Sequence, residues 1–213
     1  MSFNVDKTIK FWNRASRNFD AKVYNKYKES YDELISLTNK YLHIDDNVLD
    51  YACGTGILTI ELSGSVKRIL AIDISDQMIE KAKGKAIERN IQNVEYQVIN
   101  IFDSSLKLGS FSVILAFNIL HFFKDQSSVL TRINQLLRQD GLLISETGCF
   151  KEKMSFIVLL VKMLSKVNLH PFVKVMTCNE LENLIKRNHF ELLETKILFE
   201  KPVSYFIVAK KVE

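Results

Sequence analysis

Apolar residues in the central part of the chain fall into short runs separated by amphipathic stretches. Five runs are almost continuously apolar, which is typical of parallel strands covered by helices on both faces. They span residues 48–51, 68–72, 94–100, 112–117 and 141–146. Between the runs, apolar positions recur at helical spacing, as at Leu130, Ile133 and Leu137. This alternation predicts a parallel sheet whose strands are connected by helices.

The end of the chain follows a different pattern. Thr177 and Glu180 form a capping-box signature, which predicts the start of a helix. Two longer strand patterns follow at residues 190–199 and 203–210, and only Glu200-Lys201-Pro202 joins them, so they must pair as an antiparallel hairpin. The sequence therefore predicts a Rossmann-like α/β fold: a seven-stranded, mostly parallel sheet with a C-terminal antiparallel hairpin and helices on both faces.

Two segments lie outside this predicted sheet. Residues 5–42 show the pattern of two helices, so residues 1–43 are expected to form an N-terminal helical cap. Residues 148–176 are expected to form a lid before the last helix, and they contain an apolar helix candidate at 154–167. Its lysines leave open a second interpretation, in which this helix rests on a membrane surface. With 213 residues and only 7 Gly and 2 Pro, the chain is predicted to be a single domain, residues 1–213.

Composition and charge exclude several classes of function. The formal net charge is +4, and no dense basic stripe with interleaved aromatic residues is visible, so no nucleic-acid partner is expected. Three cysteines without a CxxC spacing predict neither a disulfide framework nor a metal site, and favour the cytoplasm. No apolar run approaches the length of about 20 residues that a transmembrane helix needs. A monomer or homodimer with a small-molecule acceptor is expected.

The candidate chemistry lies at the end of the first predicted strand. Asp50 is followed by a turn that contains Gly54 and Gly56, and the second strand ends at Asp73, seventeen residues after Gly56. In open α/β sheets, ligands bind beyond the carboxyl ends of the strands. A glycine turn lets a ligand approach the backbone, and an acid at this spacing can accept hydrogen bonds from ribose hydroxyls. The pattern predicts a cofactor that contains a nucleoside.

Two classes of cofactor compete for such a site. A dinucleotide site has a third glycine, which here is replaced by Thr59. Asp50 would also repel a pyrophosphate, whereas it would attract the amine and sulfonium of a ligand without phosphates. The residues therefore favour S-adenosylmethionine over NAD. This interpretation requires Asp73 to face the turn and the space above the turn to be open.

The chain resembles the class I S-adenosylmethionine-dependent methyltransferases, in particular the small-molecule branch that includes the ubiquinone/menaquinone-biosynthesis C-methyltransferases. The similar segments are residues 48–56, 71–75, 94–103, 117–121 and 141–146, together with Met78. The resemblance implies a methyltransferase that converts S-adenosylmethionine to S-adenosylhomocysteine and acts on a small, apolar or aromatic acceptor. Two alternatives stay open: a protein or nucleic-acid methyltransferase, and a non-catalytic module that binds the cofactor.

The resemblance also assigns residues to the cofactor. From the methionyl end to the adenine, they are Asp50, Ala52, Gly54, Gly56, Asn118, Asp73, Ile74, Met78, Asn100 and Ile101. Two of them depart from the family pattern. Ala52 stands in place of a glycine, which matters if that position needs a positive φ. Asn100 stands in place of an aspartate and lacks its charge, so weaker cofactor binding is expected.

Methyl transfer from a sulfonium is an in-line displacement, which depends mainly on alignment and the exclusion of water. The N-terminal cap and the lid are expected to cover the acceptor. Their aromatic residues predicted to line its pocket are Trp12, Phe19, Tyr24, Phe156 and Phe172. His121 lies three residues after Asn118 and is the candidate general base. The alternative is that His121 only caps a helix or shapes the pocket.

Overall fold

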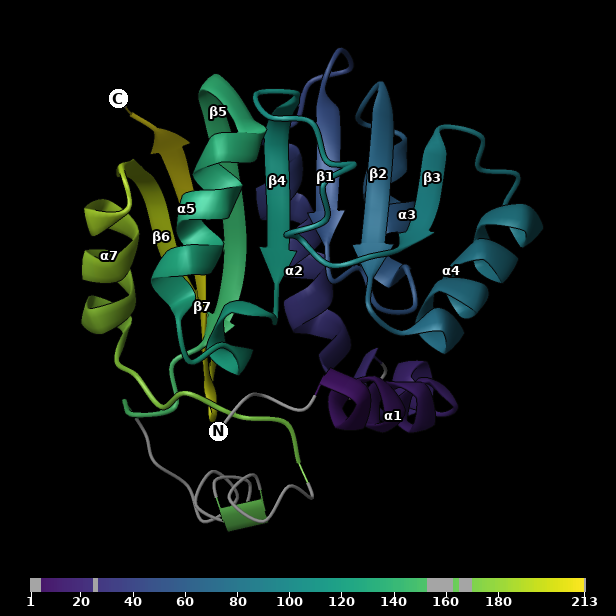
Figure 1. Ribbon diagram of the computed structural model, residues 1–213, viewed down its shortest axis with the longest axis horizontal. Helices are drawn as coiled ribbons and strands as arrows, with labels where there is room; N and C mark the ends of the chain where they lie inside the picture. The colour runs from purple at the N-terminus through teal and green to yellow at the C-terminus, as the bar shows by residue number, and fades with distance from the viewer. Residues whose placement is uncertain (1–4, 25–26, 153–162, 165–169, 213) are drawn as a thin grey trace.

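Seven strands form one sheet in the computed structural model, which describes residues 5–24, 27–152, 163–164 and 170–212 (Figure 1). The strand order is β3-β2-β1-β4-β5-β7-β6. The strands are β1 (Asn47–Tyr51), β2 (Arg68–Asp73), β3 (Val94–Val98), β4 (Phe111–Phe117), β5 (Leu137–Gly148), β6 (Phe190–Glu200) and β7 (Val203–Lys211). Strands β1 to β5 pair in parallel, whereas β7 is antiparallel to both β5 and β6. The predicted Rossmann-like sheet with a C-terminal hairpin is confirmed.

Helices cover both faces of the sheet. They are α1 (Val5–Ser16), the π-helical turn η1 (Asp20–Tyr24), α2 (Lys28–Asn39), α3 (Ile57–Ser63), α4 (Asp76–Glu88), the 3₁₀ turn η3 (Leu120–Phe122), α5 (Gln126–Leu136) and α7 (Cys178–Arg187). Figure 1 shows α5 and α7 in front of the sheet and α2 behind it. Helix α1 lies across the edge where the parallel strands end, and it packs against α4. The N-terminal segment therefore covers the edge at which α/β folds bind ligands.

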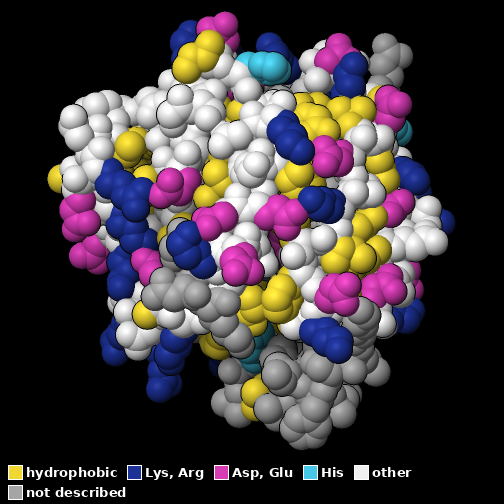
Figure 2. Space-filling model, turned by 180° about the vertical axis from the view of Figure 1, so that it is seen from behind, with side chains coloured by type: hydrophobic (Ala, Val, Ile, Leu, Met, Phe, Trp, Pro, Cys, Tyr) yellow, Lys and Arg dark blue, Asp and Glu magenta, His cyan; other side chains and the backbone are white. Residues whose placement is uncertain are grey.

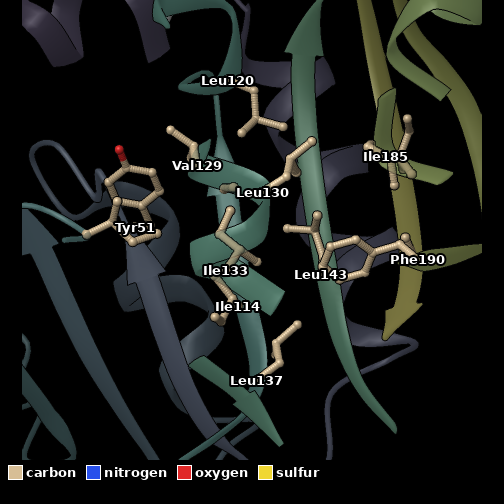
Figure 3. Close-up of a cluster of buried hydrophobic side chains, with 14 of the residues drawn as sticks. Tyr51, Ile114, Leu120, Val129, Leu130, Ile133, Leu137, Leu143, Ile185 and Phe190 are labelled. Atoms are coloured by element: carbon tan, nitrogen blue, oxygen red, sulfur yellow. The ribbon is translucent and has the colours of Figure 1, made fainter. Parts of the chain in front are cut away.

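The core on the α5 and α7 face consists of mostly aliphatic side chains, which come from the helices and from the sheet (Figure 3). Leu130 and Ile133 of α5 and Ile185 of α7 pack against Ile114 of β4 and Leu143 of β5, and all five are fully buried. Complete burial stabilises each such side chain by roughly 2 kcal/mol. The helical spacing read from the sequence places Leu130 and Ile133 on the inner face of α5.

The opposite core lies under α2, α3 and α4. Leu34 of α2, Leu62 of α3 and Ile79 of α4 are buried against sheet residues that include Val48 and Leu115. Side-chain contacts tie α2 to the far edge of the sheet: Tyr41, just after this helix, donates to Glu194 of β6 (2.6 Å), and Glu33 pairs with Lys196 (2.5 Å). Helix α2 is therefore held over the strands at the hairpin end of the sheet.

Strand boundaries differ from the prediction by more than one residue in two places. Strand β3 ends at Val98, and β5 runs from Leu137 to Gly148. Strand β5 starts early because Leu137 already pairs with Phe111, and the register shifts before Leu142 pairs with Val113. A Cβ at Gly141 would lie 2.9 Å from the Arg138 carbonyl oxygen, so this glycine allows the irregularity and does not mark the beginning of the strand.

The segment before the sheet forms the two predicted helices, with the π-helical turn η1 between them. The candidate helix at 154–167 lies outside the described residues except for 163–164, which are helical. Within the described ranges, no helix is both long and apolar enough to cross a membrane. Figure 2 shows acidic and basic side chains interspersed across the middle of the face opposite to that of Figure 1.

Candidate cofactor and acceptor site

The turn after β1 has an unusual backbone. Ala52, Gly54 and Gly56 all have positive φ, at 62°, 55° and 75°. The Cys53 amide donates to the Ile72 carbonyl (3.0 Å), which fixes the turn against the end of β2. A left-handed conformation costs a residue with a Cβ roughly 1–2 kcal/mol. The departure from glycine at Ala52 therefore falls on a position where glycine would be more stable.

Gly56 has a different function from the one the resemblance implies. A Cβ at this position would lie 2.8 Å from the Ala82 Cβ and 3.4 Å from the Tyr96 hydroxyl oxygen. Gly56 thus allows the start of α3 to pack closely against α4, and it is not among the residues that line the cavity described below. The structure places Gly56 in helix packing and not beside the ligand space.

The Asp73 side chain faces the glycine turn, as the interpretation requires. One carboxylate oxygen, Oδ2, accepts from the Gly54 amide (3.0 Å), and the other, Oδ1, accepts from the Ser75 amide (2.9 Å). Burial raises the pKa of Asp73, although these amide donors oppose the rise. Each oxygen retains a lone pair for one more donor. Asp73 is therefore fixed by the backbone and still able to accept hydrogen bonds from a diol.

Asp50 lies beside the same turn and is almost completely buried. The Thr59 hydroxyl donates to its Oδ2, so the residue that replaces the third glycine anchors this carboxylate. The pKa of Asp50 is raised to about 6: burial raises it most, the Thr59 bond lowers it, and the nearby charge of Asp73 raises it. Within the described part of the chain, no basic residue forms an ion pair with Asp50 or Asp73. Two buried acids without a counter-ion suit a cationic ligand and oppose a pyrophosphate.

A cavity of about 790 Å³ opens beside these two carboxylates, so the space above the turn is not filled. Its walls come from the ends of β1, β2, β4, β5 and β7 and from the N-terminal cap. The predicted site residues that line it are Trp12, Phe19, Asp50, Ala52, Gly54, Asp73, Ile74, Met78, Asn100, Asn118 and His121. The volume is in the range of small-molecule and cofactor sites.

At the end of the cavity where the resemblance implies the adenine, the chain after β3 alternates between the cavity and the core. Asn100 lines the cavity, and its Oδ1 accepts from the Phe102 amide (2.8 Å). Phe102 lines it too and is 52% exposed. Ile101 lies between them and is fully buried among the side chains under α5. The expected cavity contact of Ile101 is therefore not found, and the exposed ring of Phe102, which the sequence analysis missed, takes its place.

The acceptor end is covered by aromatic side chains. Trp12 of α1 packs edge-on against Phe122 of η3, with ring centroids 5.3 Å apart. Phe172 does not line the cavity: its ring lies near the Lys124 ammonium, 5.5 Å from Nζ to the ring centroid. The Tyr24 side chain and all of Phe156 lie outside the part of the chain that the structure describes.

Two sets of polar contacts hold the N-terminal cap against the cofactor loops. Asn13 accepts from the Ser75 hydroxyl (2.6 Å) and donates to Asp76 (2.7 Å), at the beginning of α4. Asp20 accepts from the Thr55 hydroxyl (2.6 Å) and pairs with Lys85 of α4. The cap is therefore bonded directly to the glycine turn and to the start of α4.

His121 is buried in η3 and lines the cavity. The Gly148 amide donates to its Nδ1 (3.4 Å), so in the neutral ring the proton is on Nε2. The pKa of His121 is lowered to about 3, mainly by burial and in addition by the neighbouring His170. A ring with these properties is a weak base and a competent hydrogen-bond donor. The geometry favours donation by His121 over the proton abstraction expected from the sequence.

Glu146, near the end of β5, is a cavity residue to which the sequence analysis gave no function. The Ser204 hydroxyl of β7 donates to its Oε1, while no donor among the described residues forms a hydrogen bond with its Oε2, which is buried. Burial raises the pKa of Glu146 to about 7, and Ser204 and Asn118 partly oppose the rise. The only signal in the sequence is an acid within an otherwise apolar run.

Metal chemistry finds no support in the described ranges, where no group of three His, Cys, Asp or Glu is placed to hold an ion. Cys53, Cys149 and Cys178 are free thiols. Burial, together with the charges of Asp50 and Asp73, raises the pKa of the Cys53 thiol well above its ordinary value. This thiol next to the glycine turn is therefore a poor nucleophile.

Comparison with known proteins identifies the family. The family model described as "Methyltransferase domain" matches residues 42–196. The chain is 31% identical over 149 residues to the malonyl-[acyl-carrier protein] O-methyltransferase of Acetivibrio thermocellus, and the match covers 67% of this chain and 50% of that protein. It is 24% identical over 163 residues to the ubiquinone biosynthesis O-methyltransferase of Albidiferax ferrireducens, with 74% and 64% covered. The chain thus spans only about half to two thirds of these relatives.

Among solved structures, the fold is similar to that of geranyl diphosphate C-methyltransferase from Streptomyces coelicolor A3(2), crystallised with Mg²⁺, geranyl diphosphate and S-adenosyl-L-homocysteine. The TM-score is 0.68, the sequence identity is 14%, and the match covers 83% of this chain and 79% of that one. At this identity the similarity concerns the fold alone. The family match contains Asp50, the glycine turn, Asp73 and Glu146, and it confirms the resemblance found in the sequence: the chain belongs to the methyltransferase domain family.

Proposed function

We propose that the protein is an S-adenosylmethionine-dependent methyltransferase that acts on a small, apolar or aromatic acceptor. The observation that carries this proposal is the Asp73 carboxylate, fixed by the Gly54 and Ser75 amides at the edge of the cavity. Asp50 stands beside it without a counter-ion among the described residues. Family membership supports the same activity.

The residues present fit the cofactor. Asp73 would accept from the ribose hydroxyls through its remaining lone pairs, and Asp50 would attract the amine and the sulfonium. Ile74, Met78 and Phe102 would flank the adenine at the other end. When bound, S-adenosylmethionine supplies an electrophilic methyl group on a positively charged sulfur. The protein then has to bind both reactants in line and exclude water.

The acceptor would occupy the rest of the cavity. Trp12, Phe19, Phe122 and Phe150 line it, which favours an apolar or aromatic molecule. The similar protein from Streptomyces coelicolor is named for a small molecule, geranyl diphosphate, which supports a small acceptor. His121 would donate a hydrogen bond from Nε2 and so orient the acceptor, without acting as the base.

The same proposal covers the organisation of the chain. Residues 1–213 would act as one domain in which residues 1–43 cover the cofactor, and the contacts of Asn13 and Asp20 support this arrangement. The free thiols of the described residues fit the reducing cytoplasm that the cysteine spacing favours.

Calorimetric titration with S-adenosylmethionine and S-adenosylhomocysteine tests the cofactor site first. Transfer of an isotopically labelled methyl group into small molecules of a cell extract then tests the activity, and the Asp73→Ala variant serves as the blank. We expect heat with both ligands and labelled small products that the variant does not form. No heat at saturating concentration of either ligand would contradict the proposal.

A further inference from the structure

The acceptor end of the cavity contains a buried carboxylate that the proposed activity does not yet use. Glu146 is 4% exposed and lines the cavity, and Ser204 fixes only its Oε1. No donor among the described residues meets its Oε2 with regular hydrogen-bond geometry, although Asn118 lies close enough to the carboxylate to lower its pKa. Leaving such an oxygen unpaired is costly in a folded protein, because its hydration is lost and not replaced. An orphaned acceptor in the wall of a cavity indicates a ligand that donates to it.

The surroundings of Glu146 identify its place in the cavity. Asn118, assigned to the methionyl end of the cofactor, donates its backbone amide to the Glu146 carbonyl (2.8 Å), so the two residues are neighbours. Tyr31 of α2 also lines the cavity, and burial followed by the charge of Glu146 raises its pKa. Glu146 therefore lies where the expected methyl position meets the acceptor space under α2.

We propose that Glu146 binds the methyl acceptor through its free Oε2, and that this acceptor is an apolar or aromatic molecule with one neutral hydroxyl group. The inference rests on the proposed methyltransferase function and deepens it. A hydroxyl brings one donor, which matches the single free oxygen. An ammonium brings three donors and a charge that would repel the neighbouring sulfonium.

The chemical step balances with these groups. The acceptor oxygen forms a bond to the methyl carbon, and the bond from that carbon to the sulfonium sulfur breaks with its electron pair remaining on sulfur. The hydroxyl proton passes to Oε2 of Glu146. The positive charge on sulfur and the negative charge on the carboxylate disappear together, so no new charge is created in the buried cavity. Glu146 then returns the proton to water when the product leaves.

Two probes test this assignment: para-propylphenol and its methyl ether para-propylanisole, which lacks the hydroxyl donor. Their binding is measured with the protein saturated with S-adenosylhomocysteine, so that no transfer occurs. A hydrogen bond to a charged group is worth about a tenfold difference in affinity. We expect the wild-type protein to bind the phenol about tenfold more tightly than the ether, and Glu146→Gln to reduce this preference to about threefold or less.

The matched control is Glu88→Gln, which removes the same charge from an exposed residue at the end of α4 and should keep the full preference. An unchanged preference in Glu146→Gln overturns the inference, as does tighter binding of the ether by the wild-type protein. If Glu146→Gln does not fold, Glu146→Asp decides by the same criterion, since it withdraws the carboxylate by one methylene group.

The titration with S-adenosylhomocysteine separates this inference from the proposed function. If wild-type protein binds S-adenosylhomocysteine but shows no dependence on Glu146, only the acceptor assignment is overturned. If wild-type protein does not bind S-adenosylhomocysteine at all, the proposed function fails and the acceptor assignment fails with it.

Discussion

The two ends of the cavity satisfy their buried carboxylates in opposite ways. At the β1 and β2 end, both oxygens of Asp73 accept from backbone amides, and Asp50 is held by Thr59 on the adjacent helix. At the β5 and β7 end, Glu146 has one oxygen held by Ser204 and one without a partner among the described residues. The first end is organised before any ligand arrives, while the second keeps a free acceptor.

This difference fits what each end has to recognise. A cofactor is the same in every turnover, so a rigid set of backbone contacts close in the chain can bind it. An acceptor is specific to each enzyme, and its pocket here combines α1, α2, β5 and the β6–β7 hairpin. The cofactor end should therefore respond sharply to small changes in its backbone, and the acceptor end should respond mainly to changes in charge.

The largest expected effect is the loss of cofactor binding in Asp73→Ala. The substitution removes the acceptor of the Gly54 and Ser75 amides and the proposed acceptor of the ribose hydroxyls. Hydrogen bonds to a charged group of this kind are worth about 3 kcal/mol, which corresponds to an affinity for S-adenosylhomocysteine lower by a factor on the order of 100. Calorimetry measures the change.

The control for this variant is Asp45→Ala, which removes an exposed carboxylate from the loop before β1. It should bind S-adenosylhomocysteine like the wild-type protein. Equal binding by both variants would show that the rigid end of the cavity is not the cofactor site.

The next effect concerns how closely the cofactor end is packed. Gly56→Ala places a Cβ 2.8 Å from that of Ala82 and forces a side chain into φ +75°. The left-handed conformation and the steric clash together should lower the free energy of unfolding by about 2–3 kcal/mol. Urea denaturation followed by circular dichroism measures this loss.

Gly84→Ala is the matched control for Gly56→Ala, because the same methyl group would meet no atom within 4 Å inside α4. It should raise the free energy of unfolding by about 0.5–1 kcal/mol, since alanine favours the helix more than glycine does. If the two variants have the same stability, the packing of Gly56 against α4 is not a constraint on the turn.

The acceptor end should be visible in the pH dependence of stability. Burial raises the pKa of Glu146 from 4.5 to about 7, so the folded protein keeps a proton that the unfolded chain has lost. The stabilisation that this bound proton gives to the folded state is complete below pH 4.5 and is lost as the pH rises through about 7. The ionisation of Glu146 should lower the free energy of unfolding by on the order of 2 kcal/mol between pH 5 and 7.5.

Glu146→Gln should flatten the pH dependence, because the amide does not titrate, and Glu88→Gln should leave it unchanged. Denaturation of each protein without ligand, at a series of pH values, provides the comparison. Asp50 acts in the same direction, so a residual slope is expected in Glu146→Gln. A slope as steep as that of the wild-type protein would contradict the burial of a titrating carboxylate at this end.

A smaller effect distinguishes the charge of the ligand at the cofactor end. Both ligands carry the amine, but S-adenosylmethionine has a cationic sulfur and S-adenosylhomocysteine a neutral one, so the former gains more from ionised Asp50. With a pKa of about 6, the ionised fraction of Asp50 rises about fourfold between pH 5.5 and 7.5. The affinity ratio of the two ligands should rise with pH, by at most about this factor. A ratio independent of pH would indicate that the Asp50 carboxylate does not interact with the sulfonium.

The cofactor end could be predicted from the sequence because its signals are local. Strand, glycine turn and Asp73 follow one another within a short stretch, and parallel pairing of β1 with β2 brings them together. The expectation for Ile101 was wrong by one position. Successive side chains after β3 point alternately to the cavity and to the core, so Phe102 and not Ile101 lines the cavity.

The acceptor end could not be predicted in this way. The environment of Glu146 depends on Ser204, which follows it by 58 residues, and on Tyr31 of α2. Nothing in the run Ile144-Ser145-Glu146 indicates that one carboxylate oxygen stays unpaired, because this depends on which side chains of distant elements reach it. Thr59 was missed for a related reason: it was considered only as a missing glycine, whereas it is a hydrogen-bond donor to Asp50.

The smallest expected effect tests the one unfavourable backbone position at the rigid end. Ala52 has φ 62°, where a Cβ is strained, so Ala52→Gly should relieve the strain. Glycine also gains entropy in the unfolded chain, which offsets part of the relief, and a net increase of about 0.5 kcal/mol in the free energy of unfolding is expected. Ala86→Gly, in the last turn of α4 and without positive φ, is the control and should lower stability by about 1 kcal/mol or more. Urea denaturation compares the two variants. If Ala52→Gly is destabilised as much as the control, the turn does not hold residue 52 in the left-handed conformation, and the cofactor end is less rigid than its hydrogen bonds indicate.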